Sequence, residues 1–123
     1  MNVVDSSGWL EYFANGKNSG FFAPAIEDPS RLLIPTLSLY EVFRRILQQR
    51  GEAPALQAIA LMYQGRVVDL DAGLALAAAR LSATDRLPLA DSVILATARS
   101  LGATLWTQDA DFAGREGVRY IAA

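Results

Sequence analysis

The segment spanning residues 87–112 constrains the fold more than any other part of the chain. Pro88 suits the first turn of a helix, and apolar residues recur at helical spacing from there to Leu101 with almost no charge, so the pattern predicts a largely buried helix. Gly102 is placed to end this helix, and residues 103–107 form a short apolar strand. A helix followed by a strand of this kind is half of an α/β unit, whose ligands bind beyond the strand ends.

Short strands alternate with helices along the whole chain, which indicates a parallel sheet covered by helices. We expect a single domain of residues 1–123, built as a three-layer α/β/α sandwich with a four- to five-stranded, mainly parallel sheet. Ser6 or Ser7 is expected to cap the first helix, and Thr36 or Ser38 the third. The other expected strands span residues 2–4, 32–35, 66–69 and 118–121, and the other expected helices include residues 9–13, 21–26, 39–47, 53–63 and 72–81.

Composition narrows the chemistry that the chain can perform. The 123 residues include neither cysteine nor histidine, so any metal must be held by oxygen, which favours magnesium or manganese. The net charge of −2 gives no general attraction for nucleic acid. The excess of arginine over lysine fits either phosphate recognition or a GC-rich genome, and we favour the genome as its cause. Neither a signal peptide nor an apolar run of membrane-spanning length is visible, so we expect a cytoplasmic protein without membrane contact.

Four acidic residues follow strands or begin helices: Asp5, Glu41, Asp91 and Asp109. Strand ends and neighbouring helix starts share one edge of a parallel sheet, so these carboxylates are expected to converge. Converging carboxylates repel one another unless a divalent metal neutralises them. Such a metal can generate hydroxide and stabilise a phosphodiester under attack. Hydroxyls of Ser6, Ser7 or Thr107 are candidates for orienting the metal ligands.

Each acid also has an ordinary structural interpretation. Asp5 can cap a helix, Glu41 can be a solvated helix residue, and Asp91 can complement a helix dipole. Asp109 and its neighbour Asp111 can be turn residues. A shared position at one sheet edge is harder to explain in this way. Asp69 and Asp71, by contrast, are interpreted as a strand end and a helix cap away from the site.

The ordered motifs around these acids resemble those of PIN-domain ribonucleases, and the length and final strand are similar to the VapC toxins of bacterial type II toxin–antitoxin pairs. The motifs are Val3-Val4-Asp5-Ser6-Ser7, Leu39-Tyr40-Glu41-Val42, the stretch from Leu89 to Ala98, and Thr107-Gln108-Asp109-Ala110-Asp111-Phe112. The resemblance implies that Asp5, Glu41, Asp91 and Asp109 form a catalytic site that binds Mg²⁺ or Mn²⁺ and cleaves RNA. It also implies hydroxyl roles for Ser7 and Thr107, a homodimer, and an antitoxin whose C-terminal segment occupies a groove near the site.

Three functional hypotheses follow. The first is a toxin endoribonuclease with Asp5, Asp91 and Asp109 as metal ligands and Glu41 acting through water; charge removal at Asp5 or Asp91 should then abolish cleavage without unfolding. The second is a catalytically weak module that binds RNA or a protein partner. A phosphoacceptor receiver domain is rejected, because Asp5 lacks an acidic neighbour and Lys17 is the only lysine.

Three further features of the sequence have more than one interpretation. The role of Asp111, an extra acid, stays open. The arginines at positions 44, 45 and 86 can hold flanking phosphates or can lie on solvated helix faces. The aromatic residues near the N-terminus can belong to the core or to a groove for a partner: Trp9, Phe13, Phe21 and Phe22.

Overall fold

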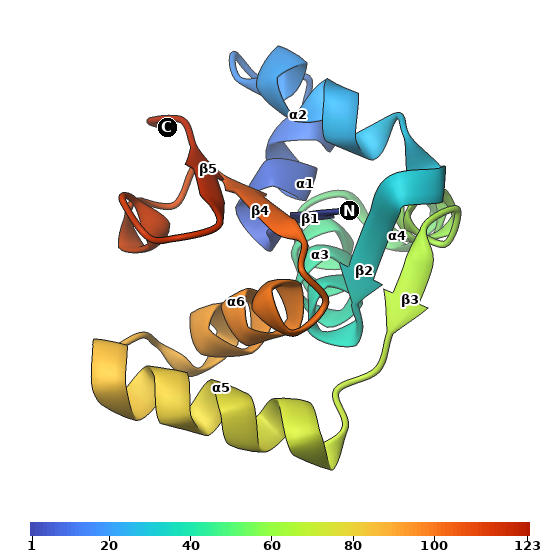
Figure 1. Cartoon of the computed structure of the whole chain (residues 1–123). Coiled ribbons are helices and arrows are strands. Elements are labelled where there is room, and N and C mark those ends of the chain that lie inside the picture. Colours follow the sequence, from blue (N-terminus) through green and yellow to red (C-terminus); the bar gives the residue numbers. More distant parts are fainter.

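The computed structural model describes residues 1–123 and contains one sheet of five parallel strands in the order β3-β2-β1-β4-β5 (Figure 1). All five predicted strands are present, and the predicted mainly parallel sheet is confirmed. Because every strand runs the same way, all the C-terminal strand ends lie at one edge of the sheet. The strands are β1 (Asn2–Val4), β2 (Leu32–Pro35), β3 (Arg66–Val68), β4 (Thr104–Thr107) and β5 (Val118–Tyr120).

Six α-helices connect the strands, at the places where the sequence pattern predicts them. The fifth runs to Asp85, beyond the expected end at residue 81, and stops where Arg86 adopts a left-handed backbone conformation. No helix combines the length and apolar character needed to cross a bilayer. The helices are α1 (Ser6–Phe13), α2 (Ser19–Ile26), α3 (Thr36–Arg50), α4 (Glu52–Met62), α5 (Ala72–Asp85) and α6 (Leu89–Ser100), with single 3₁₀ turns at Pro29–Arg31 and Ala110–Phe112.

Successive side chains of each strand point to opposite faces of the sheet, and this divides the core into two halves. Val4 and Trp106 face one side and join a cluster with buried residues of α1, α2, α3 and α4. Val3 and Leu105 face the other side and pack against α6. Helix α5 packs on α6, farther from the sheet (Figure 1). The expected three-layer α/β/α sandwich is therefore confirmed.

Helix α6 lies against the sheet with residues 92–98 all buried, as its uncharged sequence predicts. The two buried hydroxyls within it bond to their own helix: Ser92 Oγ donates to Leu89 O and Thr97 Oγ1 donates to Val93 O. Such bonding lets polar residues sit in an apolar layer without unpaired groups. The rigid placement of α6 fixes the position of its first turn, which carries Asp91.

The helix caps differ from the sequence-based expectation. Asp5 caps α1, in place of Ser6 or Ser7, and its carboxylate accepts a hydrogen bond from Gly8 N–H. Strand β2 runs directly into α3, so no residue between them can fold back as a cap. Thr36 instead accepts a bond from Leu70 N–H, and the buried Ser38 hydroxyl has no partner.

The N-terminal aromatic residues belong mainly to the core. Trp9 and Phe22 are fully buried in the cluster on the α1–α2 side of the sheet. Phe13 and Phe21 are partly buried and pack against the same cluster. The core interpretation therefore holds for the first pair, while the second pair keeps some exposed surface.

Gly8 is a close-packed position beneath the first turn of α1. A Cβ added there would lie 2.6 Å from Phe22 Cε1 and 2.7 Å from Val4 Cγ1. Gly8→Ala should therefore destabilise the fold by about 1–3 kcal/mol despite the better helix propensity of alanine. Urea denaturation measures the effect.

Gly20→Ala is the matched control, because Gly20 lies in α2 with nothing within 4 Å of an added Cβ. This control should hold or slightly raise stability. Equal stability of both variants would contradict the packing argument.

Candidate metal centre

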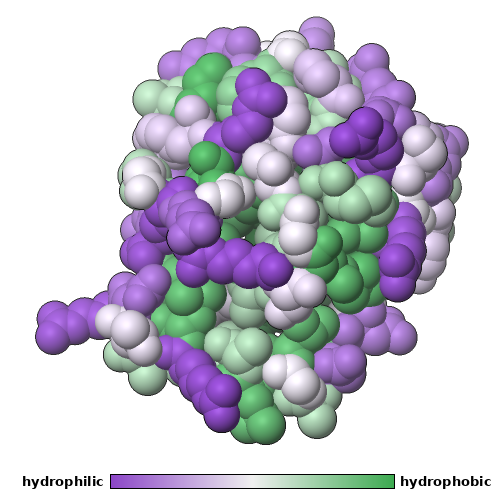
Figure 2. Space-filling view, in the orientation of Figure 1, coloured by the Kyte–Doolittle hydropathy of each residue, from purple (hydrophilic) through white to green (hydrophobic).

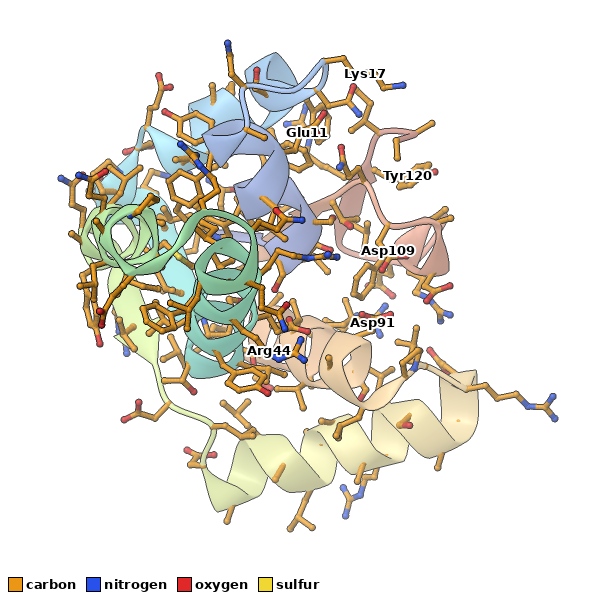
Figure 3. The ribbon with its side chains drawn as sticks, turned by 180° about the vertical axis from the view of Figure 1, so that it is seen from behind. Glu11, Lys17, Arg44, Asp91, Asp109 and Tyr120 are labelled. Atoms are coloured by element: carbon orange, nitrogen blue, oxygen red, sulfur yellow. The ribbon has the colours of Figure 1, made fainter.

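Three aspartates gather at the C-terminal edge of the sheet. One carboxylate oxygen from each of Asp91, Asp109 and Asp111 lies within 4.8 Å of the others. Asp91 comes from the first turn of α6, and the other two come from the loop and 3₁₀ turn after β4. Figure 3 shows Asp91 and Asp109 next to one another, reached from separate elements. The structure thus brings two of the predicted acids together with the extra acid whose role the sequence leaves open.

Asp5 lies beside this trio but is held differently. It directly follows β1, retains only 5% of its exposed surface, and both of its oxygens accept hydrogen bonds. Oδ1 accepts from Ser7 Oγ at 2.8 Å and from Gly8 N at 3.1 Å, and Oδ2 accepts from Thr107 Oγ1 at 2.9 Å. The predicted interactions of Ser7 and Thr107 with the acidic site are therefore seen at Asp5.

The Thr107 hydroxyl connects Asp5 to the trio. It donates to Asp5 and accepts a hydrogen bond from Asp109 N–H at 2.9 Å. Asp109 Oδ1 in turn accepts from Asp111 N–H at 2.9 Å. One oxygen of Asp109 is thus fixed by the backbone of its own turn, and its other oxygen has no hydrogen-bond partner within the chain.

Glu41 stands apart from the other predicted acids. It is half-buried on α3, and its Oε1 accepts a hydrogen bond from Ser6 Oγ at 2.6 Å. Ser6 begins α1 directly after Asp5, so this bond ties α3 to the strand end that carries the site. Glu41 is not among the three acids whose oxygens cluster, so its connection to them runs through α1.

Crowding and burial raise the affinity of two of these carboxyls for protons. The pKa of Asp5 rises to about 6, mainly because burial disfavours its charge, although the bonds from Ser7, Thr107 and Gly8 oppose the rise. The pKa of Asp91 rises to about 7 through burial first, and then through the charge of Asp109, a hydrogen bond with Asp111 and further repulsion. Both carboxyls would gain from a nearby positive charge.

No basic side chain forms an ion pair with these carboxylates, although Arg115 Nε donates a hydrogen bond to the backbone carbonyl of Asp111 at 2.8 Å. The single ion pair in the structure joins Arg115 to Asp85 at 3.3 Å, and neither residue belongs to the acid group. Every candidate ligand atom is a carboxylate oxygen, which is the donor type that magnesium and manganese prefer. The acidic site therefore fits a hard divalent cation.

The shifted pKa values make the stability of the metal-free protein depend on pH. The folded state keeps protons on Asp5 and Asp91 that the unfolded chain releases above pH 3.8. Without divalent metal, stability should fall from about pH 4 to about pH 7, by on the order of 3 kcal/mol from buried Asp5 and by a smaller amount from the partly exposed Asp91, whose charge solvent screens. Thermal melting in chelator at several pH values measures this slope.

Asp91→Asn provides the comparison, because it removes one of the two shifted groups and relieves repulsion. This variant should show a shallower slope and should melt no lower than wild type at neutral pH. A wild-type protein whose stability rises over the same range would contradict the crowding of these acids.

Comparison with known proteins places the fold in a family. The family model for the PIN domain matches residues 3–117, so the chain belongs to the PIN-domain family. No curated protein sequence matches the chain significantly. The resemblance predicted from the four motifs is thereby confirmed.

Solved structures show the same fold at low sequence identity. A toxin–antitoxin complex from Klebsiella pneumoniae has a TM-score of 0.83 at 21% identity, covering 97% of this chain and 96% of that one. The sarcin–ricin loop-cleaving toxin VapC20 of Mycobacterium tuberculosis has a TM-score of 0.77 at 23% identity, covering 97% and 99%. A DNA-bound VapBC structure from Salmonella typhimurium has a TM-score of 0.76 at 17% identity, covering 99% and 98%.

Proposed function

We propose that this chain, as a single PIN domain, is a metal-dependent endoribonuclease and the toxin of a type II toxin–antitoxin pair. The observation that carries the proposal is the group of carboxylates without a basic counter-ion at the sheet edge of a PIN-family fold. The similar structures support it, since they include a toxin–antitoxin complex and a sarcin–ricin loop-cleaving toxin. The substrate would be RNA, and the reaction hydrolysis of its phosphodiester bonds.

Within this proposal the acids have different roles. Asp91 and Asp109 would hold Mg²⁺ or Mn²⁺ directly, because each offers an oxygen to the cluster. Asp5 would be a further ligand held in place by Ser7 and Thr107, and Glu41 would act through water. A bound metal would supply Lewis acidity and a hydroxide nucleophile. The chain itself would orient the carboxylates, and it places no basic side chain in an ion pair with them.

The decisive test of the nuclease is cleavage of mixed cellular RNA. Wild type should cleave in magnesium or manganese and lose cleavage in excess chelator, because the acidic site repels a phosphate without the metal. Asp91→Asn should lower the cleavage rate by at least a hundredfold. Asp71→Asn is the matched control: Asp71 caps α5 through Leu74 N–H, and asparagine caps a helix equally well.

A second readout tests metal binding without activity. Magnesium should raise the melting temperature more at neutral pH than near pH 5, because protons and metal compete for the same carboxylates. Cleavage that persists in chelator would contradict the metal-dependent mechanism. Metal binding without cleavage of any RNA would favour the alternative, a PIN-like module that binds RNA or a protein without cutting.

We also propose an antitoxin partner, a cytoplasmic location and a homodimer, as the family resemblance implies. Apolar surface for a second copy is present along α5 and the start of α6, where Leu76 is 65% exposed and Leu89 is 79% exposed. A hollow of about 430 Å³ between these helices is lined mainly by alanine, leucine and valine. Figure 2 shows apolar surface at the bottom of the molecule, where α5 lies.

The dimer is testable by light scattering. The wild type should have the mass of two chains, and Leu76→Asp combined with Leu89→Asp should give a folded monomer, since buried carboxylates would oppose contact. Leu56→Asp on α4, at a leucine that is 53% exposed, is the control and should stay dimeric. A wild-type monomer at high concentration would contradict the dimer.

A further inference from the structure

A groove of mixed polar and apolar lining runs between α1 and α3 and reaches the acidic site. It consists of two adjoining hollows of about 390 Å³ each, which share Leu10 and Arg45 in their walls. Ser7 and Gln108 line the first hollow, and Glu41 lines the second. Ser7 bonds to Asp5, and Gln108 directly precedes Asp109, so the groove opens beside the carboxylates. Figure 3 looks onto this region, with Glu11, Arg44 and Asp109 around it.

Arginines concentrate in this groove. Arg44, Arg45 and Arg50 all line it, all are exposed, and none forms an ion pair. Arg44 and Arg45 come one turn after Glu41 on the same face of α3. The face continues through Gln48 and Gln49, so it extends about 12 Å beyond Glu41 along the helix axis.

Acidic groups do not cancel this charge along the groove. Glu11 is the one acid of the first hollow, and its Oε2 accepts a hydrogen bond from Asn18 N–H. Glu41 is the one acid of the second hollow, and its Oε1 accepts a hydrogen bond from Ser6 Oγ. Three arginines against two glutamates therefore leave the groove with an excess of positive charge beside the acidic site. A polyanion that starts at a metal-filled site would be held by this positive charge.

The groove also has apolar side chains in its walls: Leu10, Phe13, Ala14 and Ile46. Several further polar and aromatic lining groups suit single-stranded nucleic acid. Arginine forks match phosphate oxygens, and the side-chain amides of Gln48 and Gln49 can bond to base edges. Tyr40 is 63% exposed in the wall of the second hollow, where a base can stack on its ring. An acidic peptide would use the arginines but would have no need of the exposed ring or of the adjoining carboxylates. RNA is therefore the favoured occupant.

We propose that the α1–α3 groove binds the RNA strand on one side of the scissile phosphate, with Arg44, Arg45 and Arg50 holding the phosphates of that strand. The inference rests on the proposed nuclease function and adds a substrate-binding site to it. Arg86, which the sequence also offers for flanking phosphates, does not line this groove. The three arginines bind and position the strand, and they do not touch the reacting atoms.

The test compares a triple variant, Arg44→Gln with Arg45→Gln and Arg50→Gln, against wild type and Arg80→Gln. Arg80 is the matched control, since it is an exposed arginine within α5 and lines none of the groove. The probe is a fluorescently labelled single-stranded RNA of mixed sequence, with calcium in place of magnesium. Melting temperatures and far-ultraviolet circular dichroism show whether each variant is folded.

The triple variant should bind the RNA at least tenfold more weakly than wild type. The slope of log affinity against log salt should become shallower by about 2, since each lost phosphate contact removes about 0.7 for a single strand. In cleavage assays KM should rise while kcat at saturating RNA changes little. Arg80→Gln should match wild type in every measurement.

Different failures have different meanings. Wild-type cleavage together with unchanged affinity and salt slope in the triple variant would overturn the groove and leave the nuclease intact. Absence of cleavage in wild type, with RNA binding that the three substitutions weaken, would remove the nuclease and keep the groove. Failure of the wild type to bind RNA would contradict the proposed RNA-binding role of the groove. Unchanged RNA binding with loss of antitoxin binding would also overturn it, in favour of a protein occupant.

Discussion

The hydroxyl of Thr107 joins the two strand ends from which the acidic site is built. It donates to Asp5 at the end of β1 and accepts from the backbone of Asp109 beyond β4. Because β1 and β4 pair in parallel, with Val4 opposite Trp106, the two acids leave the sheet side by side. Their closeness is a result of sheet topology, and burial then raises the pKa of Asp5. Repulsion and burial of this kind favour either protonation of the carboxyls or the binding of a cation.

Much of this arrangement can be predicted from the sequence, because the fold follows from simple alternation. Apolar runs of three or four residues separated by helical patterns predict a parallel sheet, and a parallel sheet places acids such as Asp5 and Asp109 at one edge. The buried character of α6 likewise follows from its lack of charge. These inferences depend on periodicity and connection rules, which do not require side-chain geometry.

The details of the site that the sequence does not predict depend on which side-chain oxygen accepts a hydrogen bond from which donor. Asp111 joins the three-carboxylate group because the 3₁₀ turn after Asp109 brings its side chain back toward Asp91, and sequence spacing alone cannot show that direction. Glu41 falls about one and a half turns into α3, since β2 enters that helix without a linker. It therefore meets Ser6 instead of the aspartates. A threonine or serine cap on α3 would have required a linker between β2 and α3, and no linker is present.

The same direct passage from β2 into α3 sets the relation between the acidic site and the groove. One face of α3 carries Glu41, which bonds to Ser6, and Arg44 and Arg45 follow one turn farther on. A single helix thus presents one negative and two positive side chains to the second hollow. The spacing between these charges is fixed by helix geometry and does not depend on loop conformation.

Asp5 shows that a helix cap and a site acid need not be alternatives. Its Oδ1 caps α1 through Gly8 N–H, and its Oδ2 faces Thr107 at the point where the strand ends meet. That Asp5→Asn leaves the protein folded stays a prediction, but an amide in place of one oxygen would lose the acceptor of the buried Thr107 hydroxyl and so cost some stability. Asp91 bears no such bond to the backbone, so its substitution separates the effect of charge from the effect of structure. Loss of activity at Asp91 could be attributed to the lost charge in the acidic site, whereas loss at Asp5 would combine the effects of charge and of structure.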